Sequence, residues 1–188
     1  MRASTRRKAS ALCALALLST LVACATPAPP PEPSPTATTA APVFATDAEA
    51  LAAATEAYAA YVSVSDLIFA EGGVRPERID EVASGTLAAS VRDESAYAVG
   101  AGLRSTGANT FDSISLQSVD EAASRGVVII YLCSDVSATD VLDSNGVSVV
   151  KADRPPRTPF QVSFDWKDST HRELVVGSQN VWTGGGVC

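Results

Sequence analysis

The spacing of apolar residues changes once along the chain, near residue 107. Before that point apolar residues recur at steps of three and four, which is the spacing of one face of an α-helix. The run from Asp47 to Phe69 predicts a long helix, because Thr46 and Glu49 have the spacing of a capping box and Gly72-Gly73 follows its end. Shorter helices are expected over residues 76–82 and from Ser84 to about Gly107.

After residue 107 apolar and polar residues alternate, as they do along a half-buried β-strand. Residues 160–166 are the clearest case, and their alternation places Asp165 on the polar side, facing water. The nearly continuous apolar run at 127–136 indicates a central strand, and Asn145-Gly146 between two short apolar segments indicates a tight hairpin. The expected strands are 110–119, 127–136, 141–142, 147–150, 160–166 and 174–182.

Helices that precede about four to six antiparallel strands predict an α+β fold, in which the N-terminal helices pack on one face of a curved antiparallel sheet. This order of elements, over residues 44–188, resembles the NTF2-like (cystatin-like, cone-shaped) superfamily. Three details are similar to uncharacterised lipoproteins of Gram-positive bacteria, namely Thr110-Phe111-Asp112, Tyr131-Leu132-Cys133 and the C-terminal stretch from Trp182 to Cys188. The resemblance implies a pocket between the long helix and the sheet, and it carries over no activity.

Residues 1–23 have the composition of a secretory signal peptide, with basic residues before position 9 and an apolar run after them. The run is shorter than the roughly 20 residues that span a bilayer. Leu21-Val22-Ala23-Cys24 resembles the lipobox of bacterial lipoproteins, which implies cleavage before Cys24 and a diacylglyceryl group on its thiol. The protein would then be extracytoplasmic and attached to the cell membrane through this lipid alone. The alternative is an ordinary secretory signal that happens to contain a cysteine.

Residues 24–43 are rich in proline, alanine and threonine and carry one charge, Glu32, which predicts a disordered, extended linker. The remaining residues, 44–188, are enough for one domain of ordinary size. The chain has 14 basic and 21 acidic residues, so removal of a leader with four basic residues changes its formal charge from −7 to 10 − 21 = −11. An acidic domain repels phosphates, which argues against a nucleic-acid partner.

Cleavage before an acylated Cys24 would discard Cys13 and leave two thiols, Cys133 and Cys188, in an exported domain. An even number of cysteines in an oxidising compartment predicts a disulfide between them. A reactive thiol and a metal pair are the alternatives. Neither cysteine has histidine or carboxylate neighbours at the close spacing of a metal site, and no metal or cofactor is predicted.

The NTF2-like resemblance supplies the candidates for chemistry. Some relatives isomerise or dehydrate small molecules in the pocket, using an acid and an aromatic hydroxyl. The candidate hydroxyls are those of Tyr58, Tyr61 and Tyr97. The candidate acids are Asp112, Asp135 and Asp165. Tyrosines that pack in the core with their hydroxyls at its rim are the alternative interpretation.

No catalytic set emerges from the sequence. His171 is the only histidine, and the polar stretch 167–172 around it indicates an exposed turn rather than a catalytic base. The leading hypothesis is therefore a lipoprotein that binds a small ligand or an envelope protein without catalysis. The first alternative is a pocket enzyme of the isomerase or dehydratase type. A homodimer formed through an open sheet face is the second.

Overall fold

The computed structural model describes residues 41–188, and every structural statement below concerns this part of the chain. The expected signal peptide at 1–23, the lipidation site at Cys24 and most of the expected linker at 24–43 lie outside the described residues. Within residues 41–188, no helix combines the length and the apolar character that a membrane span needs.

The first helix, α1, spans Asp47–Ala70 and confirms the predicted long helix, with one residue added at its end. The Oγ1 of Thr46 accepts a hydrogen bond from the amide of Glu49 at 3.2 Å. The Glu49 carboxylate accepts from the amide of Ala45 at 2.8 Å, one residue before the position that a capping box predicts. The first bond satisfies one of the first amides of α1, which have no partner inside the helix, and the second holds the residue before Thr46 against the first turn.

Two further helical segments follow, the 3₁₀ helix η1 at Pro76–Glu81 and the α-helix α2 at Gly85–Ala101. Ile68 of α1, Ile79 of η1 and Val91 of α2 are buried in one small apolar cluster, which joins the three segments. Gly73 occupies the turn between α1 and η1 with φ +83°, and a Cβ there would overlap the backbone of Ser95 in α2. The close approach of the two helices therefore requires glycine at this turn.

Four strands form an antiparallel sheet in the order β2-β3-β5-β6, namely β2 (Thr110–Val119), β3 (Val128–Asp135), β5 (Arg157–Trp166) and β6 (Leu174–Val181). The other two, β1 (Arg104–Thr106) and β4 (Asp140–Leu142), pair in a separate two-stranded sheet. The predicted hairpin at Asn145-Gly146 is confirmed, although residues 147–150 do not form a regular strand. Leu142 and Ser148 make an antiparallel bridge, and the amide of Val149 donates to the carbonyl of Val141 at 2.9 Å. The pairing of β4 with β1 was not expected.

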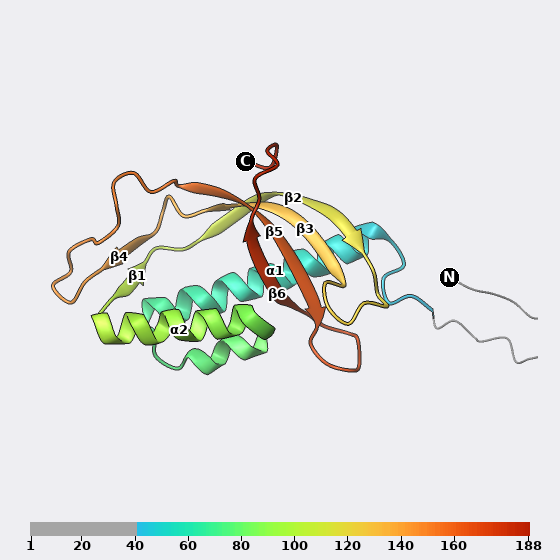
Figure 1. Ribbon diagram of the computed structural model, residues 1–188, viewed down its shortest axis with the longest axis horizontal. Coiled ribbons are helices and arrows are strands. Elements are labelled where there is room, and N and C mark those ends of the chain that lie inside the picture. Colours follow the sequence, from blue (N-terminus) through green and yellow to red (C-terminus); the bar gives the residue numbers. More distant parts are fainter. Residues whose placement is uncertain (1–40) are drawn as a thin grey trace, which may run out of the picture. The chain divides into compact units, whose positions relative to one another are not determined.

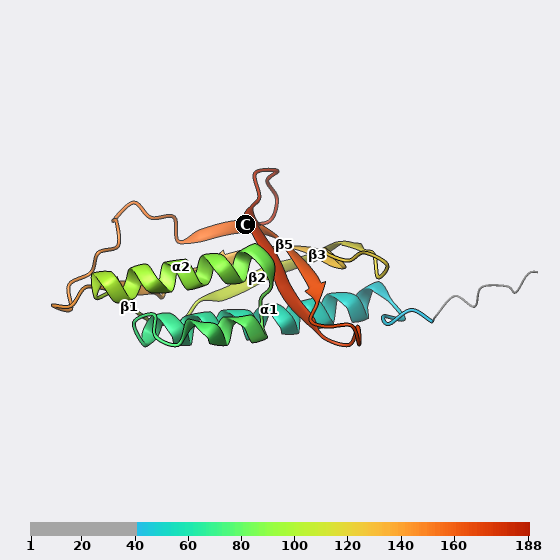
Figure 2. The same ribbon diagram turned by 60° about the horizontal axis from the view of Figure 1, so that its bottom comes forward.

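Both α-helices lie on one side of the four-stranded sheet (Figures 1 and 2). We call the face that meets α1 the inner face and the opposite one the outer face. Ala54 and Tyr58 of α1 share a buried apolar cluster with Ile130 and Leu132 of β3 and Phe164 of β5. Each large apolar side chain buried in this way contributes about 1.5–3 kcal/mol. The predicted α+β architecture, with N-terminal helices packed on a curved antiparallel sheet, is confirmed.

Asp165 departs from the sequence prediction, because its side chain is buried and does not face water. Its carboxylate accepts hydrogen bonds from the Oγ of Ser84 and from the amide of Gly126, both at 2.8 Å. Gly177 of β6 lies beside it, and a Cβ there would sit 2.6 Å from the Oδ2 of Asp165. Alternation along a strand predicts the face on which a residue lies. It does not predict the segments that cover this face, here the residue before α2 and the loop before β3.

Candidate functional site

A cleft of about 210 Å³ opens between α1 and the inner face, where β3 and β6 end and β5 begins. Its hydroxyl groups come from Tyr58, Tyr61, Ser65, Ser134 and Thr158. Its amide side chains are Asn109 and Gln179. Its apolar walls are Val62, Val136 and Phe160. Among the described residues, the lining thus offers neutral hydrogen-bonding groups and apolar surface, without a carboxylate or a basic side chain.

The cleft exists because the inward residues of the strands change from apolar to polar. Ile130 and Leu132 of β3 are buried in the core, and the next inward residue is Ser134. Ser134 stands opposite Thr158 in the register of β3 and β5. These two small polar side chains leave space between α1 and the sheet that apolar side chains do not fill, and the cleft lies in this space.

Tyr58 is the most deeply placed of the three candidate tyrosines, with 2% of its surface exposed. Its hydroxyl donates a hydrogen bond to the Oε1 of Gln179 over a long distance of 3.4 Å. Its ring meets that of Phe111 edge-on, with centroids 4.8 Å apart. The ring of Tyr61, three residues later on α1, has its centroid 5.8 Å from that of Tyr58.

Burial keeps both phenols neutral. Desolvation, with a smaller contribution from repulsion by Tyr61, raises the pKa of Tyr58 far above its ordinary value. Desolvation, followed by the negative charge of Glu94, raises the pKa of Tyr61 to about 12. Both hydroxyls therefore stay protonated near neutral pH, and they can donate as well as accept hydrogen bonds.

Tyr97 does not belong to this cleft, which corrects the expectation that three tyrosines share one pocket. Its side chain is 70% exposed. It lines a separate, mainly apolar cleft of about 260 Å³ together with Phe69 and Leu103. The reason is the rotation of α2, which turns Ser95 and Ala98 inward and leaves Tyr97 on its solvent side.

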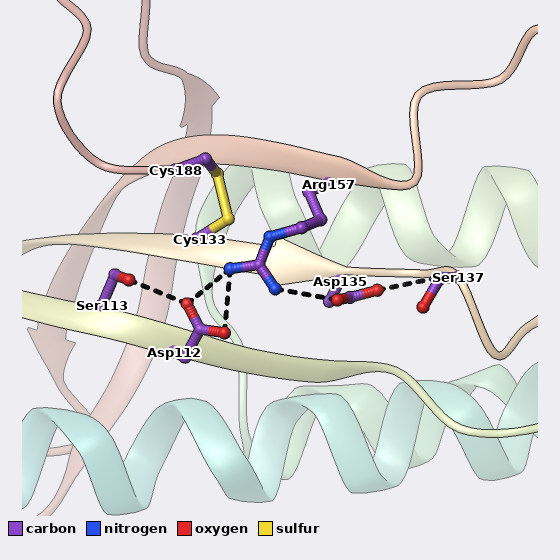
Figure 3. The surroundings of a disulfide bond; sticks show 7 residues. All are labelled: Asp112, Ser113, Cys133, Asp135, Ser137, Arg157 and Cys188. Atoms are coloured by element: carbon purple, nitrogen blue, oxygen red, sulfur yellow. Dashed lines mark hydrogen bonds and ion pairs between the residues drawn. A yellow bond between two sulfur atoms is a disulfide. The ribbon is translucent and has the colours of Figure 1, made fainter.

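None of the three candidate aspartates lines the tyrosine cleft. Asp165 is enclosed elsewhere, and Asp112 and Asp135 lie on the outer face, where both pair with Arg157 (Figure 3). The guanidinium nitrogens of Arg157 lie 2.6 Å from the Asp112 carboxylate and 2.8 Å from that of Asp135. The hydrogen bond from Arg157 lowers the pKa of Asp112. Hydrogen bonds from Ser137 and then from Arg157 lower the pKa of Asp135.

The outer face also carries the disulfide between Cys133 and Cys188, which confirms the predicted pairing (Figure 3). The two Cα atoms are 5.2 Å apart, and Cys133 has no exposed surface. Trp182, which follows β6, packs on Tyr131 with ring centroids 4.6 Å apart. The segment 182–188 is thereby held against the outer face at both of its ends.

His171 is exposed in the turn between β5 and β6, as predicted. Its ring stacks on that of Trp166 with centroids 5.3 Å apart, and the ring of Phe44 stacks on the same indole at 5.6 Å. In residues 41–188 there is no group of three or more histidine, cysteine, aspartate or glutamate side chains placed to hold a metal ion. The contacts of His171 are those of a packed surface residue.

Comparisons with known proteins add little to this geometry. No protein-family profile matches the chain, and no curated protein matches it. Among solved structures the chain is similar to the crystal structure of the intermembrane space region of the chloroplast protein ARC6, with 18% sequence identity and a TM-score of 0.49. The alignment covers 68% of this chain and 92% of that one. So distant a likeness carries no information on function, which has to be inferred from the residues of this chain.

Two tyrosines of the cleft are predicted by the sequence, and the polar residues that complete the cleft are not. The missed residues are Ser65, Asn109, Ser134, Thr158 and Gln179. The strand residues carry a usable signal, because Ser134 continues the inward series of Ile130 and Leu132 at steps of two. A polar residue that continues a buried apolar series marks a place where the core is incomplete.

Proposed function

We propose that this protein is a cell-envelope lipoprotein whose NTF2-like domain binds a small, uncharged, polar ligand in the tyrosine cleft. The lipobox-like Leu21-Val22-Ala23-Cys24 supports the lipid anchor. Helices followed by a meander of antiparallel strands support the NTF2-like assignment. The observation that carries the ligand proposal is the neutral lining of the cleft.

The chemistry of the lining selects the class of ligand. An anion that entered the cleft would lose hydration without meeting a positive charge, and a cation would find no carboxylate in the lining itself, so the entry of either ion is unfavourable by several kcal/mol. An uncharged ligand meets hydroxyls and amides that both donate and accept. The hydrogen bond of 3.4 Å between Tyr58 and Gln179 is long, so a ligand can replace it at little cost. A volume of about 210 Å³ lies below the range for drug-sized ligands, so the ligand is small.

The positions of the acids support binding without catalysis. An isomerase or dehydratase of this kind places a carboxylic acid beside an aromatic hydroxyl. Here Asp112 and Asp135 pair with Arg157 on the opposite face of the sheet. Asp165 is occupied by Ser84 and Gly126. The tyrosine hydroxyls thus have no carboxyl partner among the described residues that line the cleft.

Native mass spectrometry of the full-length protein, extracted from its own membranes in mild detergent, tests the ligand proposal. We expect the wild type to carry the mass of one additional small molecule. Val62→Phe fills the cleft and should abolish this excess, because Val62 lines the cleft from α1. The matched control is Ala59→Phe at an exposed position of the same helix, which should retain the ligand.

Circular dichroism and thermal unfolding establish that both variants are folded before their masses are compared. The ligand proposal is contradicted by a wild type without excess mass. An excess that survives Val62→Phe in a folded protein would place the ligand elsewhere.

The anchor is tested separately by labelling growing cells with palmitate and fractionating them. Cys24→Ala should lose the label and leave the membrane fraction, because a thioether needs the thiol. Cys13→Ala is the matched control. This variant should keep the palmitate label and stay in the membrane fraction, since cleavage before Cys24 discards residue 13. Equal labelling of the two variants would refute the lipobox assignment.

A further inference from the structure

The end of α2 carries exposed apolar surface that the proposed function does not use. The cleft beside Tyr97, of about 260 Å³, lies where α2, β1 and β4 come together (Figure 1). A second cleft of about 320 Å³ adjoins it, and the two share Ala98, Leu103 and Arg104. Val74 and Val99 line the second cleft and are exposed, as Tyr97 is. We call the two clefts, together with Val74, Tyr97 and Val99, the α2 patch.

The α2 patch has an exposed aromatic ring beside a hollow. Tyr97 lies at the edge of a cleft whose apolar lining includes Phe69, Leu103 and Val141. Contiguous exposed apolar surface of this kind marks a site of interaction. Tyrosine is also one of the residues that contribute most to binding when a pocket of the partner encloses it.

Two charged side chains line the same cleft, Glu94 of α2 and Arg104 of β1. Within residues 41–188 neither of them forms an ion pair, with the other or with a third residue. Although Glu94 is exposed, neighbouring protein atoms displace part of its hydration and raise the pKa of its carboxyl. A partly dehydrated carboxylate without a cation beside it is unfavourable, and a cation from a partner would relieve it.

The charges of the α2 patch are balanced. The side chains that line its two clefts include three charged ones, Glu71, Glu94 and Arg104. Glu71 is already paired with Arg75 and Arg78, so one unpaired charge of each sign is left. The chain from residue 24 onward has a formal charge of 10 − 21 = −11, which makes two copies repel each other over most of their surface. The α2 patch is free of this repulsion.

These features select the partner. A matching surface has to offer a cation opposite Glu94, an anion opposite Arg104 and a hollow for Tyr97. A second copy related by a two-fold axis offers all three, because in such an interface each residue meets the counterpart of its own partner. A uniformly acidic or basic partner would satisfy one of the two charges and repel the other. An apolar ligand would leave both charges unpaired.

We propose that the α2 patch joins two copies of this chain in a two-fold symmetric dimer. Glu94 of each copy pairs with Arg104 of the other, and each Tyr97 ring enters the hollow of the facing copy. This surface belongs to the helical side of the domain and differs from the open sheet face that the sequence suggested for a dimer. The tyrosine cleft shares no lining residue with the cleft beside Tyr97, so the inference goes beyond the proposed function and does not depend on it.

Native mass spectrometry of the full-length protein, released from mild detergent at micromolar concentration, tests the proposal. We expect the wild type to be a dimer. Glu94→Arg and Arg104→Glu each bring like charges together at two places in the dimer, so each should raise its dissociation constant at least about tenfold. The matched controls are Glu56→Arg and Arg172→Glu, which reverse exposed charges at a different cleft and should leave the dimer unchanged.

Mixing the two charge variants gives the most specific readout. An equimolar mixture of Glu94→Arg and Arg104→Glu should form dimers again, because one partner then contributes two positive charges and the other two negative ones. These dimers should contain one copy of each variant, which their mass shows directly. Tyr97→Ala should weaken the dimer more than about tenfold, since the ring is lost from both hollows. Circular dichroism and urea unfolding establish that each variant is folded.

Three results would overturn the proposal. One is a wild type that stays monomeric at high micromolar concentration. Another is a dimer that both Glu94→Arg and Arg104→Glu leave intact, which would place the interface on a different surface, such as the open sheet face. The third is a mixture of the two folded charge variants that remains monomeric, because Glu94 and Arg104 would then not face each other.

Discussion

Leu132 and Cys133 are adjacent residues of β3, and neither has any exposed surface. Leu132 is on the inner face and is buried by the apolar core beneath α1. Cys133 is on the outer face and carries a covalent bond to the C-terminal segment. The comparison shows that equal burial has two different causes in one strand. Apolar packing stabilises the inner face. The outer face is largely polar, and at one place a disulfide attaches the C-terminal segment to it.

The largest effect is expected from breaking the inner face. Leu132→Ala should lower the free energy of unfolding by about 2–5 kcal/mol, because it removes buried methyl groups and leaves a cavity. Gln161→Ala, on the outer face of the neighbouring strand, should change it by no more than about 0.5 kcal/mol. Urea unfolding followed by circular dichroism measures both. Equal losses from the two variants would mean that the two faces do not differ as described.

Releasing the C-terminal segment should have the next largest effect. Cys188→Ser opens a loop whose ends are 55 residues apart. It should lower the free energy of unfolding by about 2–4 kcal/mol. Reduction of the wild type should lower its urea midpoint to that of the variant. Identical midpoints for oxidised wild type and variant would show that the bond contributes nothing to stability.

The contact between Gly177 and the buried Asp165, on strands β6 and β5, allows a third test with a smaller expected effect. Gly177→Ala forces a Cβ to within 2.6 Å of the Asp165 carboxylate. This overpacking should lower the free energy of unfolding by about 1–3 kcal/mol. The control is Gly100→Ala in α2, where the new Cβ meets nothing within 4 Å. Because alanine has the higher helix propensity, this control should raise the free energy of unfolding by about 0.5–1 kcal/mol. A neutral Gly177→Ala in thermal unfolding would mean that Asp165 is less enclosed than the structure shows.

The smallest effect concerns acid stability on the outer face. Arg157 holds the pKa of Asp112 below its ordinary value of about 3.9, and Ser137 and Arg157 together lower that of Asp135. Lowered folded-state pKa values give stability that is present above about pH 4 and is lost as the pH falls through those values. If the urea midpoint is measured at a series of pH values, the midpoint of Arg157→Gln should therefore fall less steeply below about pH 4 than that of the wild type.

Lys151→Gln is the control for this series, because it removes one positive charge that has no acidic partner within residues 41–188. It should leave the acid limb as steep as in the wild type. Arg157→Gln and Lys151→Gln profiles that coincide would remove the ion-pair explanation.

The helices and strands were more predictable than the contacts between segments that lie far apart in the sequence. The strand expected at 110–119 has those bounds in the structure, because alternation is a local property of the backbone. The local hairpin at Asn145-Gly146 was predictable from its turn residues, whereas the pairing of β4 with β1 was not, since β1 lies far away in the sequence. The burial of Asp165 was missed for the same reason, as its cover comes from distant segments.

The candidate site was predictable only in part. Tyr58 and Tyr61 share the stripe of α1 that faces the sheet, so helical spacing brings them to the cleft. Tyr97 lies among the apolar positions of α2, but the face of that helix that is buried depends on its packing against η1, β6 and α1, which the sequence pattern does not give. Gln179 and Arg157 could not be found, because their roles depend on which side chains the folded sheet places opposite them.

Peptide mapping of the full-length protein, alkylated and digested without reduction, tests most directly whether a covalent bond closes the outer face. The account predicts one linked peptide pair that contains Cys133 and Cys188 and that separates on reduction. Neither cysteine should carry the alkylating group before reduction. Alkylation of both cysteines in the unreduced protein would contradict this prediction, because the segment 182–188 would then lack its covalent attachment to β3.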